Sequence, residues 1–102
     1  MELHEPVSQQ LGPIDTSLAY LATRSWWLPF RAGRRDVPLI DDALCIGHFC
    51  RWLEEQLIVI QDVTTSHLDA YLVALAPLRP ALRPAYEARA KALLSFFAES
   101  TT

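Results

Sequence analysis

Three arginines crowd one short stretch of the chain and are its strongest electrostatic feature. Arg31, Arg34 and Arg35 lie within five residues, and a guanidinium group can bind a phosphate through two parallel hydrogen bonds. We therefore predict that this stretch contacts phosphate groups. The alternative is a solvated loop in which the arginines pair with Asp36 and nearby acids. Further basic residues occupy the last quarter of the chain: Arg79, Arg83, Arg89 and Lys91.

The overall charge limits how strongly such cations can act. The chain has 9 basic and 12 acidic residues and a net charge of −3 at pH 7, which argues against a strongly basic nucleic-acid surface. The adjacent acids Asp41 and Asp42 diverge on a helix, so they do not form a pair for acid–base catalysis. We interpret them as acids at a helix N-terminus, where the helix dipole favours negative charge.

The cysteines offer only a weak metal pattern. Cys45 and His48 could share one face of a helix, whereas Cys50 lies about 140° around the axis from Cys45. This divergence argues against a disulfide, and no fourth metal ligand is evident. We therefore interpret both cysteines as buried structural residues and expect no metal or other cofactor. The three glycines do not cluster into a phosphate-binding loop, and no group of polar residues indicates an enzyme.

Helical spacing predicts the elements that position these residues. The first helix begins after Asp15 or Thr16 and ends at Pro29, whose ring clashes with the preceding turn. The second begins at Val37 and Pro38, because proline fits a first turn. The apolar face of the first helix is Leu18, Leu21, Ala22, Ser25 and Leu28. That of the second helix is Leu39, Ala43, Ile46, Phe49, Cys50 and Leu53, interrupted by Gly47, which indicates a close helix–helix approach.

Two more helices complete the predicted fold. Residues 57–63 are apolar but lack a partner strand, so we expect a loop that places apolar side chains in the core. Thr64 caps the third helix, and Pro84 lies in the first turn of the fourth. Their apolar faces are Leu68, Tyr71, Leu72 and Leu75, and then Tyr86, Ala90, Leu93, Leu94 and Phe97. We interpret residues 1–13 as a flexible leader and residues 14–100 as one compact all-α domain of four helices.

Three stretches of this helical part carry a resemblance to a known family. They are Phe49-Cys50-Arg51-Trp52-Leu53-Glu54-Glu55, the helix start Asp62-Val63-Thr64 followed by Leu68 and Tyr71-Leu72, and the ending Ala90-x-x-x-Leu94-x-Phe96-Phe97. The chain resembles the N-terminal core-binding (SAM-like) domain of tyrosine recombinases, the phage-integrase family. The resemblance covers residues 37–98 in its motifs and residues 14–30 in helix count only.

The resemblance implies both a fold and a function. In this family, two crossed helical hairpins form half of a C-shaped clamp on DNA, and the second and fourth helices approach the major groove beside the recombination site. It therefore implies a non-catalytic DNA-binding domain of an integrase that contacts duplex DNA through the seven basic residues given above. The family's catalytic residues belong to a separate C-terminal domain that this chain lacks, so we do not expect an enzyme.

The second helix departs from the family's pattern. Arg89 matches a usual basic position on the last helix, but Asp41 and Asp42 stand where arginines are typical. We expect weak binding of double-stranded DNA, with about 3–5 phosphates neutralised and log K falling by about 0.9 per phosphate as log salt rises. The alternative is a helical protein–protein interaction module that has kept the fold and lost DNA binding, with a protein partner or a second copy as its ligand.

We expect the protein to be cytoplasmic. No apolar run approaches the length of about 20 residues that spans a membrane. The N-terminus also lacks a basic stretch followed by an apolar one, so we expect no signal peptide.

Overall fold

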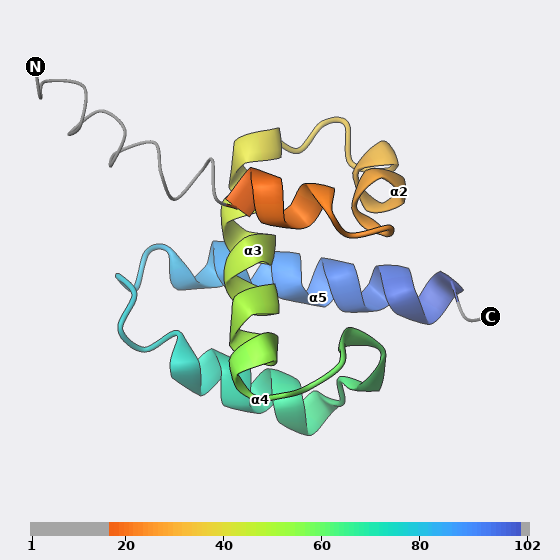
Figure 1. Ribbon diagram of the computed structural model, residues 1–102. Helices are drawn as coiled ribbons and strands as arrows, with labels where there is room; N and C mark the ends of the chain where they lie inside the picture. Colours follow the sequence, from red (N-terminus) through yellow and green to blue (C-terminus); the bar gives the residue numbers. More distant parts are fainter. Residues whose placement is uncertain (1–16, 101–102) are drawn as a thin grey trace, which may run out of the picture.

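Helices form all the regular structure in the described part of the chain. The computed structural model describes residues 17–100, and Figure 1 shows how they are arranged. The elements are a helical segment at 17–22, α2 (Trp27–Ala32), α3 (Leu39–Glu55), the 3-10 helix η1 (Ile60–Asp62), α4 (Thr65–Ala74) and α5 (Arg83–Ser100). The predicted all-α class is confirmed. The predicted leader at 1–13 and the helix start at Asp15 or Thr16 lie outside the described residues. No helix within 17–100 is long and apolar enough to cross a membrane.

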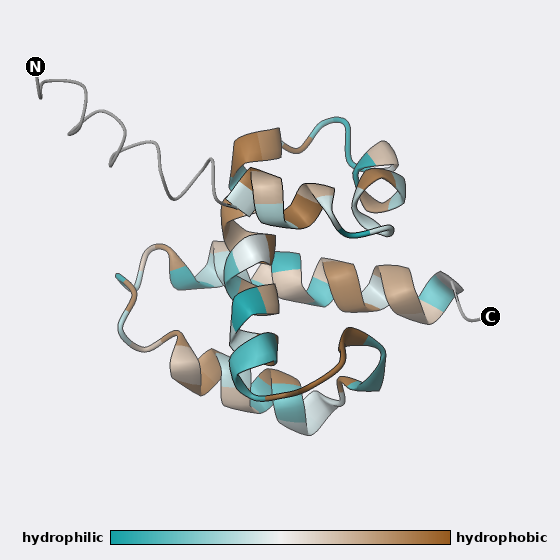
Figure 2. Ribbon diagram, viewed as in Figure 1, coloured by the Kyte–Doolittle hydropathy of each residue, from teal (hydrophilic) through white to brown (hydrophobic). Residues whose placement is uncertain are grey.

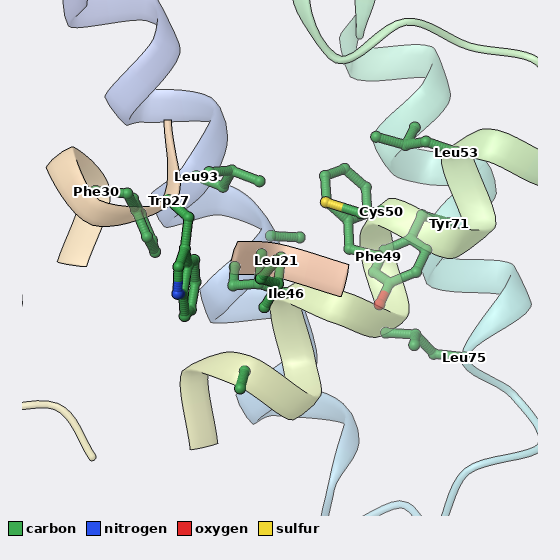
Figure 3. Packing of buried hydrophobic residues seen from close by; sticks show 12 residues of the cluster. Leu21, Trp27, Phe30, Ile46, Phe49, Cys50, Leu53, Tyr71, Leu75 and Leu93 are labelled. Carbon is green, nitrogen blue, oxygen red and sulfur yellow. The ribbon is translucent and has the colours of Figure 1, made fainter. Parts of the chain in front are cut away.

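The long helix α3 runs through the middle of the structure and packs across α5 (Figure 1). Its inward side chains are Ala43, Ile46, Phe49, Cys50 and Leu53. They meet Ala90 and Leu93 of α5, which are fully buried, and Figure 3 shows this packing around Ile46 and Phe49. The predicted apolar faces of both helices are confirmed, except at Leu39, whose side chain is 44% exposed at the start of α3.

Gly47 lets the first helical segment approach α3 closely. A Cβ atom at this position would lie 3.0 Å from Ser17 Oγ and 3.2 Å from Ser17 Cβ. Ser17 is itself buried and accepts a 3.0 Å hydrogen bond from Arg51 Nη2. Glycine costs about 1 kcal/mol relative to alanine inside a helix, but here a larger residue would force Ser17 to shift by a few tenths of an ångström. The close approach predicted at Gly47 is confirmed.

The first predicted helix is divided into two. Residues 17–22 are helical, the chain turns at 23–26, and α2 begins at Trp27. The prediction that Pro29 ends a helix is wrong, because Pro29 is the third residue of α2, where a backbone N–H has no acceptor within the helix. The predicted inner face is confirmed only at Leu18 and Leu21. It is wrong at Ala22, Ser25 and Leu28, which are exposed, whereas Trp27 and Phe30 are buried instead.

The C-terminal end of α3 closes in a Schellman motif centred on Leu57. The Ile58 N–H donates to the Leu53 carbonyl (2.9 Å), and the Leu57 N–H donates to the Glu54 carbonyl (3.1 Å). These two bonds satisfy the last carbonyls of the helix. Leu57 has a φ of 59°, a left-handed conformation that glycine adopts more easily, and its side chain is 91% exposed.

The connection after α3 meets its predicted role only in part. Ile58, Ile60 and Val63 pack against the core as expected. In contrast, Leu57 and Val59 face solvent, and Figure 2 shows this apolar stretch in brown. The connection therefore contributes to the core and also presents apolar side chains outward.

A reciprocal cap starts α4, as predicted for Thr64. The Thr64 Oγ1 accepts a hydrogen bond from the His67 N–H (3.4 Å), and the Thr64 N–H donates to His67 Nδ1 (3.0 Å). Such a capping box satisfies two backbone donors at once. The helix then directs Tyr71 and Leu75 into the core, where they are 0% and 1% exposed.

Candidate functional site

A buried carboxylate at the start of α3 forms the centre of the candidate site. Asp42 lies in the first turn of α3 and is 0% exposed. It accepts a 2.6 Å hydrogen bond from Arg31 Nη1. Arg34 binds the same carboxylate through both Nε and Nη2, each at 2.8 Å. Two of the three arginines in the basic stretch therefore turn inward to one acid.

Helix α2 and the connection that follows it hold these two arginines in place. Arg31 Nη1 also donates to the Val37 carbonyl at 3.0 Å. The Arg34 guanidinium lies 4.9 Å from the centre of the Phe30 ring, within the range of a cation–π contact. As a result, the two side chains are only 16% and 20% exposed. Each guanidinium is therefore fixed by two contacts from different parts of the fold.

Arg89 brings α5 to the same acid. Its Nε lies 3.6 Å from Asp42 Oδ1, and its Nη2 lies 3.9 Å from Asp41 Oδ2. These are ion pairs that exceed hydrogen-bond distance, and the buried Arg89 Nε has no hydrogen-bond partner within the described residues. Three guanidinium groups thus surround one carboxylate. We call Arg31, Arg34, Arg89 and Asp42 the Asp42 cluster.

Two opposing effects set the pKa of Asp42. Burial alone would raise this pKa, because a low-dielectric environment disfavours the charged form. Hydrogen bonds from Arg34 and Arg31 outweigh burial and hold the pKa of Asp42 below its usual value. The hydrogen bond between Arg34 and Asp42 also raises the pKa of Arg34. Asp42 and Arg34 are therefore both charged at neutral pH.

The Asp42 cluster corrects the interpretation of Asp41 and Asp42 as a pair of helix-end acids. Asp41 fits that role, since its side chain is 56% exposed in the first turn of α3. Asp42 does not, because it is buried and neutralises arginines. It also replaces Asp36 as the partner in the alternative proposed for the basic stretch. Arg31 and Arg34 lie eleven and eight residues from Asp42 along the chain.

Two of the other predicted DNA-binding residues also have partners in the protein. Arg83 donates to the carbonyls of Leu78 (3.0 Å) and Ala76 (2.7 Å), so it holds the connection between α4 and α5. Lys91 pairs with Glu87 at 2.7 Å on the exposed side of α5. The first contact is part of the fold, whereas the second is a surface pair of low strength.

Arg35 and Arg79 complete the predicted set, and both are exposed. Within residues 17–100 neither makes an ion pair or a side-chain hydrogen bond. The structure therefore brings Arg31, Arg34 and Arg89 together and leaves Arg35 beside them, while Arg79 lies apart in the α4–α5 connection.

Three of the twelve acids, Glu2, Glu5 and Asp15, precede residue 17. The described part thus carries nine acids and nine basic residues.

A second polar group, at the other end of α3, has no signal in the sequence. Glu54 accepts hydrogen bonds from the Tyr20 hydroxyl (2.6 Å) and from Arg24 Nη2 (2.7 Å). These residues border an open pocket of about 520 Å³ that Trp26 and Ile58 help to line. Burial, followed by the hydrogen bond to Glu54, raises the pKa of Tyr20. The partners lie 34 and 30 residues from Glu54 in the chain, so no local spacing indicates the contact.

The cysteines are buried, as predicted, and both thiols are free. Burial raises the pKa of Cys45 to about 11 and that of Cys50 to about 12, so both are protonated and weakly nucleophilic at neutral pH. His48 Nδ1 faces the Tyr71 hydroxyl at 2.8 Å. Within residues 17–100, no group of three or more His, Cys, Asp or Glu side chains is placed to hold a metal ion.

No protein-family model, no curated protein and no solved structure matches this chain.

Proposed function

We propose that this chain is a non-catalytic DNA-binding domain of the tyrosine-recombinase type, built as two crossed helical hairpins. The helices at 17–32 and α3 would form the first hairpin, and α4 and α5 the second. One observation carries the proposal: the three motif stretches occupy the helix positions that the resemblance predicts. Residues 49–55 end α3, Thr64 caps α4, and the stretch 90–97 packs the inner side of α5 against the core.

DNA contact would fall first to the cations that remain available. Arg35 and Arg79 are exposed without partners in the described part. The surface pair of Lys91 with Glu87 is worth about 0.3–0.5 kcal/mol, so Lys91 can exchange it for a phosphate. We expect these three cations to neutralise about three phosphates, the low end of the range expected from the sequence, and binding to be weak. The proposal includes no enzymatic activity, because catalysis in the resembled family belongs to another domain.

The salt dependence of DNA binding tests this proposal. With three phosphates neutralised, log K for a fluorescein-labelled duplex should fall by about 2.7 for each tenfold rise in salt. Arg79→Ala should lower that slope by about 0.9. Arg24→Ala is the matched control, since it removes an arginine that pairs with Glu54 and should leave the slope unchanged. The proposal is wrong if the chain shows no binding at low salt, or if both variants have the same effect.

An apolar groove favours a second candidate, a self-associating interaction module. The groove lies between the helix at 17–22, α2 and the start of α3, and its volume is about 710 Å³. Its walls are Leu18, Ala22, Trp27, Leu28, Ala32 and Leu39, and its charged residues are Arg31 and Arg35. Leu28 is 76% exposed at this groove, and burying such a leucine stabilises an interface by about 1.5–3 kcal/mol.

The charges beside the groove suit a second copy of the chain. Arg35 and Asp36 are adjacent, exposed and opposite in sign. In a dimer with two-fold symmetry, any contact of residue i with residue j occurs twice. Arg35 of each copy would therefore pair with Asp36 of the other while the two Leu28 side chains are buried.

Sedimentation equilibrium separates the two candidates. If the groove joins two copies, Leu28→Asp should convert a dimer to a monomer. Val73→Asp is the control, because Val73 is an equally exposed apolar residue (75%) on α4 and should leave the dimer intact. Arg35→Asp should weaken the dimer, and adding Asp36→Arg should restore it. A monomeric unmodified chain removes the second candidate, whereas a dimer without DNA binding replaces the first candidate by the second.

A further inference from the structure

We propose that the Asp42 cluster is a preformed site for a phosphate group, in which the buried Asp42 fixes Arg31 and Arg34 so that their unused N–H groups bind the anion. The role of this site in DNA binding rests on the proposed function, where it would add a fourth phosphate contact and raise the expected salt slope from about 2.7 to about 3.6. Its chemistry can be tested without DNA, because a phosphate ion and a backbone phosphate present the same oxygen acceptors.

The two arginines use only part of their hydrogen-bonding capacity on Asp42. Arg31 directs Nη1 inward, to Asp42 and to the Val37 carbonyl. Arg34 directs its Nε–Nη2 edge inward. A guanidinium has five N–H groups, and the structure shows no hydrogen bond within residues 17–100 for Arg31 Nη2 or Arg34 Nη1. Both side chains reach solvent, with 16% and 20% of their surface exposed.

The local charge also favours an added anion. Arg31, Arg34 and Arg89 face Asp42, and the exposed Arg35 follows Arg34 directly in the chain. The acids on the same side are Asp42, the exposed Asp41 and Asp36. Four positive charges therefore stand against three negative ones. One phosphate group would compensate the excess.

Fixing the arginines in advance makes phosphate binding more favourable. A free arginine side chain loses rotamer entropy when it clamps a ligand. Here Asp42, the Val37 carbonyl and the Phe30 ring already hold the two guanidiniums. Asp42 therefore acts as a positioning residue. Its own charge repels a bound anion, but by holding the two guanidiniums in place Asp42 should make anion binding more favourable overall.

Two substitutions with the same charge change test this claim. Asp41→Asn and Asp42→Asn each remove one negative charge at neighbouring positions of α3. If charge alone matters, both should tighten the binding of a labelled DNA duplex. If Asp42 positions the arginines, only Asp41→Asn should tighten binding. Asp42→Asn should weaken it about tenfold, as expected for the loss of one charge-assisted contact, and lower the salt slope by about 0.9.

A second measurement uses the unmodified protein and inorganic phosphate, so it does not depend on the folding of a variant. Phosphate is titrated against ¹⁵N-labelled protein, with chloride adjusted to keep the ionic strength constant. We expect saturable shifts of the arginine Nε resonances of Arg31 and Arg34. Arg24, which pairs with the exposed Glu54, is the internal control and should not shift.

The outcomes separate this site from the proposed function. Saturable phosphate binding without DNA binding would retain the site and remove the DNA function. DNA binding in which folded Asp42→Asn behaves like Asp41→Asn would retain the function and overturn the site. Shifts that are linear in phosphate, or equal at Arg24 and Arg34, would also overturn the site.

Discussion

The two ends of α3 carry the same kind of ion pair in opposite surroundings. Near the start, Asp42 is 0% exposed and receives Arg31 at 2.6 Å. Near the end, Glu54 has a side chain that is 53% exposed and receives Arg24 at 2.7 Å. The distances are nearly equal, so bond length does not distinguish the pairs. Solvent exposure distinguishes the two pairs, because water competes for exposed charges and screens them.

This difference determines what each acid does for the fold. Removing one partner of a buried ion pair leaves uncompensated charge in a poorly solvated place. Removing one partner of an exposed pair leaves a charge that water can solvate. The start of α3 should therefore be sensitive to substitution, and its end tolerant.

The largest expected effect is that of Asp42→Ala. This change leaves Arg31 and Arg34, both less than a quarter exposed, without their counter-ion. We expect a loss of about 3–5 kcal/mol in the free energy of unfolding, measured by urea denaturation. A loss below about 1 kcal/mol would mean that the buried pair behaves like an exposed one, and would contradict the expected difference between the two ends of α3.

Acid should weaken the start of α3 through the same residue. The pKa of Asp42 in the folded protein is lowered, whereas its unfolded value is about 3.9. The unfolded state therefore takes up protons first as the pH falls. The stabilisation is fully present above about pH 4 and is lost as the pH drops through the lower folded pKa. Urea unfolding at several pH values should show this loss, and Asp42→Asn should show a smaller dependence below pH 4.

A backbone substitution extends the comparison to the other end of α3. Leu57 adopts a left-handed conformation and is 91% exposed, so its side chain contributes little packing. Leu57→Gly should stabilise the protein by about 1 kcal/mol, because glycine avoids the steric cost of this conformation. Leu57→Ala keeps the Cβ atom and is the control, with little change expected. Equal effects of the two substitutions in thermal unfolding would argue against backbone strain.

The smallest expected effect is that of Glu54→Gln. The side chain keeps its shape and can still accept hydrogen bonds from Tyr20 and Arg24, but it loses its charge. We expect a change of about 0.2–1 kcal/mol in the free energy of unfolding, and less at high salt. A loss comparable to that of Asp42→Ala would show that exposure does not explain the contrast between the two ends.

Local spacing is enough to predict α3, α4 and α5. Each has apolar residues every three or four positions, and Thr64 and Pro84 mark helix starts. The close approach at Gly47 can also be predicted from the sequence, because a glycine inside an apolar helix face indicates a tight contact such as the one with Ser17. The division of the first helix cannot be predicted from the sequence, because Pro29 is compatible both with the end of a helix and with the first turn of one.

The Asp42 cluster is not predictable from local spacing. Its arginines come from α2, from the following loop and from α5, and only the fold brings them to one carboxylate. The sequence does show an arginine-rich stretch followed by two adjacent acids. It does not show which acid faces inward, because Asp41 and Asp42 differ only in their position around the helix axis.

The Asp42 cluster also bears on how this domain can change during evolution. Loss of Asp42 alone would leave the guanidiniums of Arg31 and Arg34 without a counter-ion. A viable replacement at position 42 should therefore be accompanied by replacements at 31 or 34. Correlated variation at these positions would mark distant relatives, even where the apolar helix faces have diverged.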